Sequence, residues 1–177
     1  AVEHLAGLGH KHIAFLSGPT NSWMSAARWK SLMTAALAAG LNVVEIGPNA
    51  PTLVTGRESL DRIRAAGVTA VVTYNDLMAI GLLRQAQEAG ISVPAQLSIV
   101  GFDNSFGSDF TTPPLTTIGQ PLTELGSLAL TQLIGILDGT DGGAGNADVH
   151  VAGAETAAAE VLGTQLIVRG STGVAAR

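Results

Sequence analysis

The chain has no cysteine, few aromatic side chains and little positive charge. The absence of cysteine excludes disulfides, thiolate nucleophiles and cysteine metal sites, and it fits a reducing cytoplasm. Only 9 Lys and Arg residues stand against 14 Asp and Glu, so this segment is poorly suited to grip a nucleic-acid backbone by itself. No apolar run is long enough to span a bilayer. The first residues lack the basic head, apolar core and cleavage site of a secretory signal.

The remaining composition is that of a folded domain. With 177 residues and a hydrophobic fraction of 46%, the chain is long enough for one domain with a core, or for a fragment of something larger. The first residues have the pattern of the last turns of a helix that closes at Gly7 or Gly9. We therefore expect the chain to be a fragment with residues missing upstream.

Strand and helix patterns alternate over the first hundred residues. Short apolar runs predict strands, and runs with helical spacing predict helices that end at Gly40, Gly67 and Gly90. This rhythm predicts an α/β fold, a parallel sheet flanked by helices on both faces. The predicted elements are strand 12–16, helix 24–39, strand 41–46, helix 54–65, strand 68–73, helix 76–89 and strand 98–102.

The rhythm changes after residue 102. A loop at 104–114 precedes a short strand at 115–118, and a strongly apolar helix follows at 122–137. The Gly/Ala-rich stretch 138–160 is typical of a flexible surface insertion. A last strand is expected at 165–168.

Polar residues follow the predicted strands at the edge where open α/β sheets bind ligands. We expect Ser17, Asn21, Arg28, Asn75 and Asp103 to converge there. Arginine supplies a rigid fork of donors, aspartate accepts, and asparagine does both, which suits a ligand rich in hydroxyls. Taken singly, Arg28 is equally typical of a solvated helix residue, Asn75 of a turn and Asp103 of a loop cap.

Two further expectations concern this edge. Asp76 is predicted as the N-cap of helix 76–89, because its carboxylate can accept from the first turn. Some aromatic rings lie in or beside the same loops, where a ring can pack on the C–H face of a sugar. These are Trp23, Tyr74, Phe106 and Phe110, whereas Phe15 and Phe102 lie within strands and are expected in the core.

The sequence contains no motif typical of a catalytic or cofactor-binding site. The glycines at 7 and 9 precede a strand instead of following one, which excludes a dinucleotide fingerprint. His4, His10, His12 and His150 lack metal-ligand spacing, and Ser17 has no nucleophile elbow around it. We expect no enzyme activity, no cofactor and no metal.

Five blocks, read in order, resemble the LacI/GalR family of bacterial transcription regulators. They are HLAGLGHKHIAFL at 4–16, YNDLMAIG at 74–81, VPAQLSIVGFDN at 93–104, PPLTTIGQ at 113–120 and LIVRGST at 166–172. The resemblance implies part of a two-lobed, periplasmic-binding-protein-like (Rossmann-like) effector domain. In that family a helix-turn-helix head, absent from this chain, comes before it.

The resemblance also implies a division of the chain. Residues 1–118 and 162–177 would form the carboxyl-terminal lobe, 119–138 a returning segment of the amino-terminal lobe, and 139–161 a flexible insertion.

By the same resemblance, Arg28, Asn75, Asp103 and Gln120 fall on ligand-contacting positions. Ile80 and Leu83 fall on the helix through which subunits pair, although packing on the chain's own sheet explains them equally well. Ala26 stands where the family often has a second arginine, so one basic contact is gone.

The expected function is a ligand-responsive transcription regulator, a repressor, acting as a cytoplasmic homodimer. Its effector would be a sugar or a related polyol or nucleoside, and operator DNA would bind through the head, with no membrane involved. The alternative is an extracytoplasmic sugar-binding protein of a transporter, which uses the same architecture. A hydrolase lacks any nucleophile and base in this sequence.

Overall fold

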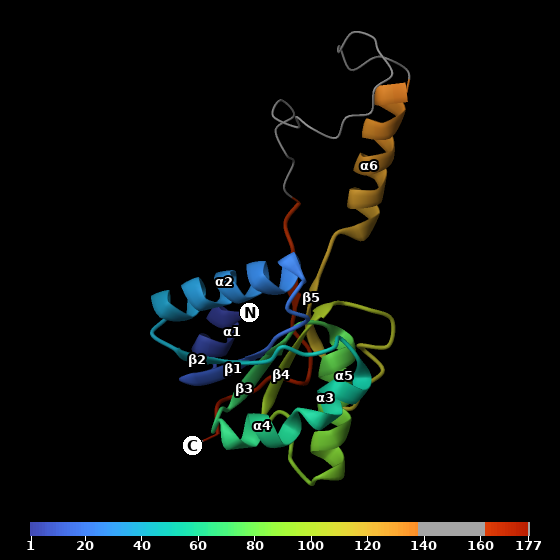
Figure 1. Ribbon diagram of the computed structural model, residues 1–177. Coiled ribbons are helices and arrows are strands. Elements are labelled where there is room, and N and C mark those ends of the chain that lie inside the picture. The colour runs from blue at the N-terminus through green and yellow to red at the C-terminus, as the bar shows by residue number, and fades with distance from the viewer. Residues whose placement is uncertain (138–161, 177) are drawn as a thin grey trace. The chain divides into compact units, whose positions relative to one another are not determined.

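A six-stranded sheet forms the centre of the larger part of the molecule (Figure 1). The structure is a computed structural model and describes residues 1–137 and 162–176. The chain divides into two units, one of Ala1–Gly119 with Gln165–Arg177 and one of Gln120–Thr164. The sheet belongs to the first unit.

Five of the six strands run parallel, as the alternating pattern predicts. The strand order is β2-β1-β3-β4-β5-β6, and only β6 pairs antiparallel, with β5. The strands are β1 His12–Leu16, β2 Asn42–Ile46, β3 Ala70–Thr73, β4 Ser98–Asp103, β5 Thr116–Gly119 and β6 Gln165–Ile167. The helices are α1 Val2–Gly7, α2 Trp23–Ala38, α3 Leu53–Glu58, α4 Leu60–Ala65, α5 Asp76–Glu88 and, in the second unit, α6 Leu122–Leu137.

Helices cover both faces of the sheet, α1 and α2 on one side and α3, α4 and α5 on the other (Figure 1). Successive strand side chains point to opposite faces. In β1, Ile13 and Phe15 therefore pack with α1 and α2, whereas Ala14 and Leu16 pack with the other layer. The predicted fold class is confirmed.

Glycines let the backbones of α3 and α5 come into direct contact. A Cβ on Gly56 would lie 2.1 Å from the carbonyl oxygen of Met78, and a Cβ on Gly81 would lie 2.1 Å from that of Leu53. The two helices therefore form a tight pair beside the carboxyl end of the sheet.

The predicted helix 54–65 is instead two short helices that meet at Ser59. The Ser59 hydroxyl donates to the carbonyl of Thr55 at 2.6 Å and accepts from Arg62 at 3.1 Å. Such bonding to the carbonyl four residues back bends helices, and spacing alone did not reveal it.

In the second unit the described secondary structure is α6, a 16-residue helix with no buried residue. The predicted insertion at 139–161 lies outside the described residues. Within the described part, no helix is long and apolar enough to cross a membrane.

Candidate functional site

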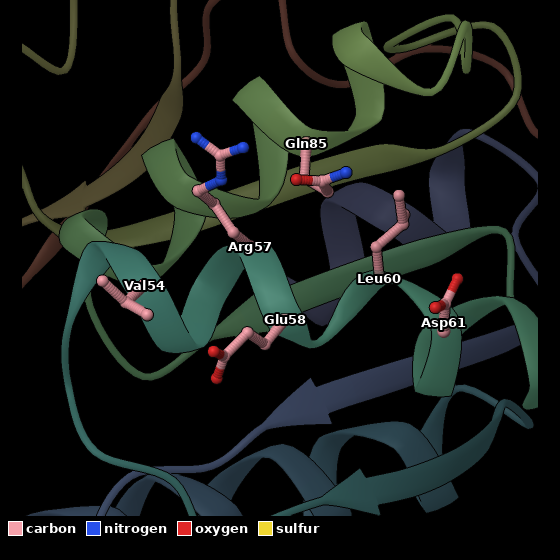
Figure 2. Close-up of a pocket in the computed structure, with 6 residues that line it drawn as sticks. All are labelled: Val54, Arg57, Glu58, Leu60, Asp61 and Gln85. Atoms are coloured by element: carbon pink, nitrogen blue, oxygen red, sulfur yellow. The ribbon is translucent and has the colours of Figure 1, made fainter.

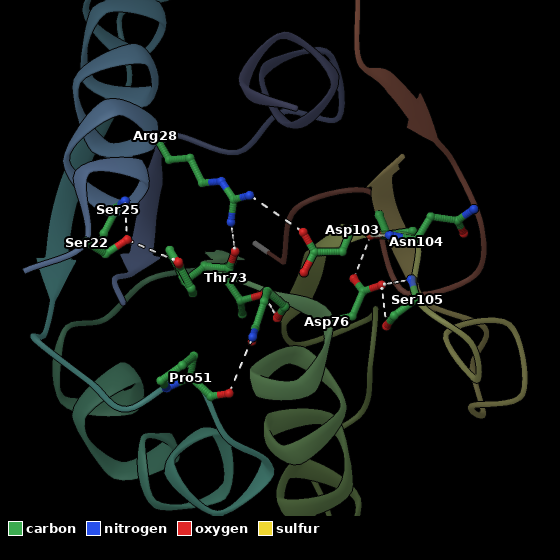
Figure 3. Close-up of polar contacts among 12 residues, drawn as sticks. Ser22, Ser25, Arg28, Pro51, Thr73, Asp76, Asp103, Asn104 and Ser105 are labelled. Carbon is green, nitrogen blue, oxygen red and sulfur yellow. Dashed lines mark hydrogen bonds and ion pairs between the residues drawn. The ribbon is translucent and has the colours of Figure 1, made fainter. Parts of the chain in front are cut away.

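Arg28 of α2 and Asp103 at the end of β4 face each other above the carboxyl ends of the strands (Figure 3). Their Nη2 and Oδ1 atoms lie 3.6 Å apart, and the side chains are 13% and 38% exposed. This distance suits an ion pair but is longer than a direct hydrogen bond. Two of the predicted site residues are therefore brought together, and the acidic side chain is the more exposed of the two.

The backbone at Asp103 has a conformation that is unusual for a residue with a side chain. Asp103 has φ 111° and Asn104 has φ 50°. Each such residue costs about 1–3 kcal/mol and persists where surrounding contacts hold it. Here Asn104 N–H donates to Thr117 Oγ1 at 3.3 Å, and Arg169 donates to Asn104 Oδ1 at 2.8 Å. These bonds hold the backbone turn that follows Asp103.

Aromatic rings surround the Arg28 guanidinium. Its central carbon lies 3.5 Å from the ring centre of Phe102 and 4.9 Å from that of Tyr74. Nη1 donates to the carbonyl of Tyr74. Burial lowers the pKa of Arg28, and the nearby Asp103 and Tyr74 oppose that shift. A guanidinium nevertheless stays charged at neutral pH.

Asn75 acts as the N-cap of α5, which corrects the prediction of Asp76 in that role. Asn75 has an extended backbone, φ −149° and ψ 171°, and its Oδ1 accepts from Met78 N–H at 3.0 Å. Its Nδ2 donates to the carbonyl of Pro51 at 3.4 Å. Both ends of the amide thus serve the local fold, and a ligand contact by Asn75 stays a prediction.

Asp76 is instead the first residue of α5, and its carboxylate ties this helix to the loop after β4 (Figure 3). It is 1% exposed. Oδ2 accepts from Ser105 N–H at 2.7 Å and Ser105 Oγ at 3.1 Å, and Oδ1 accepts from Thr117 Oγ1 at 2.6 Å. A Cβ on Gly101 would lie 2.1 Å from Oδ1, so glycine makes room for this carboxylate.

The other predicted ligand contacts are less well placed. Ser17 is 1% exposed, and its hydroxyl has no hydrogen-bond partner among the described residues and lies against Gly47. That position does not favour a contact with ligand. Asn21 is exposed in the turn before α2. Gln120 begins the second unit, so its role also stays a prediction.

The two residues predicted for subunit pairing lie on the inner side of α5. Leu83 is 1% exposed in the hydrophobic core, and Ile80 is partly buried against the same core. Leu83 therefore packs in the core of its own chain, which is the alternative that the sequence left open. Subunit pairing through Ile80, which keeps part of its surface exposed, stays a prediction.

The aromatic residues divide differently from the prediction. Phe15 is buried and stacks on Trp29, with ring centres 6.0 Å apart. Phe102, expected in the core, is only partly buried and contacts Arg28. Phe106 and Phe110 are exposed and contact each other edge to face, 5.2 Å between ring centres.

Two surface pockets occur near these elements, and neither is lined by Arg28 or Asp103. One, of about 450 Å³, is lined by residues of α3, α4 and α5 (Figure 2), namely Val54, Arg57, Glu58, Leu60, Asp61 and Gln85. The other, of about 290 Å³, lies between the start of α2 and the end of β2, with Trp29 and Glu45 in its lining. In the described ranges, no group of three or more His, Asp or Glu residues is arranged to hold a metal ion.

Comparison with known proteins gives concordant matches. The model of the periplasmic binding protein-like domain matches residues 2–172. The transcriptional repressor CytR of Escherichia coli is 33% identical over 176 residues, 97% of this chain and 48% of the relative. The regulator AscG of the same species is 35% identical over 145 residues, 80% of this chain and 43% of the relative.

Solved structures agree. A dimeric lac repressor with a carboxyl-terminal deletion superposes with a TM-score of 0.82 at 28% identity, covering 98% of this chain and 60% of that one. A LacI family regulator from Enterococcus faecium with bound ribose gives 0.81 at 26% identity, with the same coverage.

The chain therefore belongs to the periplasmic binding protein-like domain family. Its relatives within that family are LacI-type transcription regulators, which confirms the resemblance carried by the five sequence blocks. The chain spans about half the length of the curated relatives it matches, 48% for CytR.

Proposed function

We propose that this chain is the ligand-sensing part of a transcription repressor that responds to a small neutral molecule. The observation that carries the proposal is the pairing of Arg28 and Asp103 across 3.6 Å at the carboxyl edge of the sheet. Open α/β folds bind ligands at this edge. The relatives' names, which include repressors, support regulation over transport.

The chemistry of the pair suggests the class of ligand. Arg28 can only donate hydrogen bonds and ionised Asp103 can only accept them. A hydroxyl that accepts from Arg28 and donates to Asp103 satisfies both at once. A phosphate or carboxylate in the same place would set a second negative charge against Asp103. Sugars, polyols and nucleosides fit this requirement, and a relative from Enterococcus faecium was solved with ribose.

The division into lobes is part of the proposal. The first unit would be the carboxyl-terminal lobe, and α6 would be the segment that returns to the amino-terminal lobe. Ligand binding would favour one arrangement of the lobes over the other, a population shift set by differential affinity. Operator DNA would then be released or held by a helix-turn-helix head elsewhere in the whole protein, which would act in the cytoplasm. We assign no catalysis and no cofactor to this site.

Exposed apolar side chains offer a surface for pairing two subunits. The loop 104–114 is tied to both ends of α5, by Asp76 to Ser105 and by Gln87 to the carbonyl of Thr112. This arrangement sets Phe106, which is 94% exposed, beside the helix. Four exposed apolar side chains lie on α3, on the first turn of α5 and in this loop, namely Val54, Leu77, Phe106 and Phe110. A related lac repressor was solved as a dimer.

Sedimentation of the full-length protein tests this surface. Phe106→Asp is expected to shift the protein toward monomer, because a charge replaces a large apolar contact. Leu37→Asp is the matched control, since Leu37 is also exposed but lies on α2. An unchanged dimer in the Phe106 variant would remove this surface from the proposal.

Operator binding tests the function itself. The full-length protein is titrated with D-ribose, D-glucose, D-galactose and the common ribonucleosides while binding to its upstream DNA is followed. We expect one of these neutral compounds to shift the DNA-binding midpoint. An intact head with no response to any of them would count against the proposal, and a signal peptide upstream would favour the transport alternative.

A further inference from the structure

Tyr74 contacts Arg28 and the helix that carries it through three separate groups. Its backbone carbonyl accepts from Arg28 Nη1, and its ring lies 4.9 Å from the guanidinium carbon. Its hydroxyl forms a hydrogen bond of 3.2 Å with Ser22 Oγ. Ser22 is the N-cap of α2, accepting from Ser25 N–H. Tyr74, which follows β3, is thus bonded both to the N-cap of α2 and to Arg28 further along the same helix.

The position of the Tyr74 ring is limited by Gly18, two residues after the end of β1. A Cβ on Gly18 would lie 2.7 Å from ring carbons of Tyr74, closer than packed carbon atoms come. Gly18 N–H in turn donates to Ser25 Oγ at 3.0 Å, which anchors this stretch to α2. The ring therefore packs directly on backbone and has little freedom to move.

The ion pair alone does not fix the guanidinium. Asp103 attracts the guanidinium from 3.6 Å, a distance longer than that of a normal hydrogen bond. The guanidinium also contacts the Phe102 ring, whose centre lies 3.5 Å from its carbon, and the carbonyl of Tyr74. Aromatic faces attract a cation that has lost water to burial. The direction of the Arg28 donors thus depends on rings and backbone.

We propose that Tyr74 is a positioning residue of the ligand site: its ring holds Arg28 in the orientation that meets the ligand. This inference rests on the proposed function of Arg28 as a ligand contact. The backbone carbonyl survives any substitution at 74, so the ring makes the difference between variants. The hydroxyl bond to Ser22 has the lesser role of aligning the first turn of α2.

The accessibility of Arg28 tests the proposal without a ligand. The full-length protein is treated with phenylglyoxal, which modifies arginine, and each site is followed by mass spectrometry. Tyr74→Leu is expected to raise the modification rate of Arg28 by about tenfold, the equivalent of a desolvated cation–π contact. Tyr74→Phe keeps the ring and should stay within about twofold of the wild type.

Internal controls separate local release from unfolding. Arg62, bonded to Asn49 Oδ1 and Ser59 Oγ, should keep its rate in every variant. Leu37→Ala removes an exposed apolar side chain near the other end of α2 and should leave the Arg28 rate unchanged. A Tyr74→Leu protein that keeps both Arg28 and Arg62 at wild-type rates overturns the proposal.

A measurement on the wild type covers the case in which Tyr74→Leu unfolds and all arginines react faster. In arginine-labelled protein, rotation of the Arg28 guanidinium should be slower than that of the exposed Arg84. Equal rotation in the two residues would overturn the proposal.

Ligand affinity separates this inference from the proposed function. For whichever sugar or nucleoside binds, Tyr74→Leu should weaken binding about tenfold and Tyr74→Phe less than about threefold. If no compound binds the wild type, the proposed function fails, whereas the modification rates still decide the role of Tyr74. Equal affinity in the leucine variant, with binding intact in the wild type, contradicts the inference.

Discussion

At the amino ends of β1, β3 and β4, polar side chains bond to one another and to the chain's last residues. His10 lies 2.7 Å from Thr69 Oγ1 through Nδ1, and 3.1 Å from the carbonyl oxygen of Gly173 through Nε2. Gly173 N–H donates to Ser98 Oγ at 3.1 Å. At the carboxyl ends, by contrast, Arg28 and Asp103 carry full charges, lie 3.6 Å apart and are partly exposed.

Under the proposed function, the difference separates groups that stabilise the fold from groups that bind the ligand. A buried, hydrogen-bonded neutral group holds elements together, and removing it leaves partners unsatisfied. A charged pair beside a left-handed backbone turn contributes little to stability, because desolvation offsets much of the Coulomb attraction. Such groups are what a ligand can engage.

The largest stability effect is expected at Asp76. It lies at the carboxyl end of the sheet but, like the polar groups at the amino end, it is buried and hydrogen-bonded. Asp76→Ala removes the acceptor for three hydrogen bonds to Ser105 and Thr117, and should lower the free energy of unfolding by about 3 kcal/mol. Urea unfolding measures it. The exposed Asp61→Ala is the control, with an expected change below about 0.5 kcal/mol. Similar losses in the two variants would show that the bonds to Asp76 contribute nothing.

His10→Ala should lower the free energy of unfolding by about 2 kcal/mol, because Thr69 and Gly173 lose their partner and a cavity opens. His12, which is only partly buried, supplies the control substitution His12→Ala. If His10→Ala lowers the free energy of unfolding no more than His12→Ala does, the amino end does not have the stabilising role assigned to it.

Acid should weaken the amino end selectively. Burial lowers the pKa of His10 below its ordinary value of 6.5, with His4 adding to the shift and the Gly173 carbonyl opposing it. The unfolded chain therefore takes up the proton first as pH falls. The stabilisation is complete above about pH 7 and is lost below 6.5, by at most about 1.4 kcal/mol per pH unit for this group.

Urea midpoints measured between pH 7.5 and 5 follow that loss. In His10→Gln the curve should be flatter over the same range. An equally steep curve in the variant would assign the pH dependence to other groups.

Arg28→Met is expected to change the free energy of unfolding by less than about 1 kcal/mol. The variant removes a largely buried charge and leaves behind Asp103, whose side chain is 38% exposed and stays hydrated. Urea unfolding alongside His10→Ala measures the contrast between the two ends. A loss as large as that of the histidine variant would make Arg28 a structural residue.

Much of this organisation could be predicted from the sequence. Hydrophobic periodicity and the helix-ending glycines predict the parallel sheet and its two helical layers, because burial on a given face requires a given spacing. The pairing of Arg28 with Asp103 follows from their positions after parallel strands. The sequence predicts the N-cap of α5 at Asp76, one residue after its true position at Asn75, since both residue types cap helices and only the backbone angles decide between them.

Other features depend on contacts between distant segments. The bonds from Asp76 to Ser105 and Thr117 join residues up to 41 positions apart, and no local pattern encodes them. The same holds for Phe102, whose place in a strand predicts burial while its ring in fact contacts Arg28. In the sequence, Tyr74 is one of several aromatic residues near the loops, and no local pattern places its ring beside Arg28.

The most direct test of the ligand site is calorimetric titration of the full-length protein with D-ribose, D-glucose, D-galactose and the common ribonucleosides. We expect one of them to bind the wild type, and Arg28→Met to weaken that binding at least about tenfold, the value of a hydrogen bond to a charged group. His12→Ala should bind as the wild type does. Undiminished binding by Arg28→Met would contradict the assignment of the carboxyl edge as the ligand site.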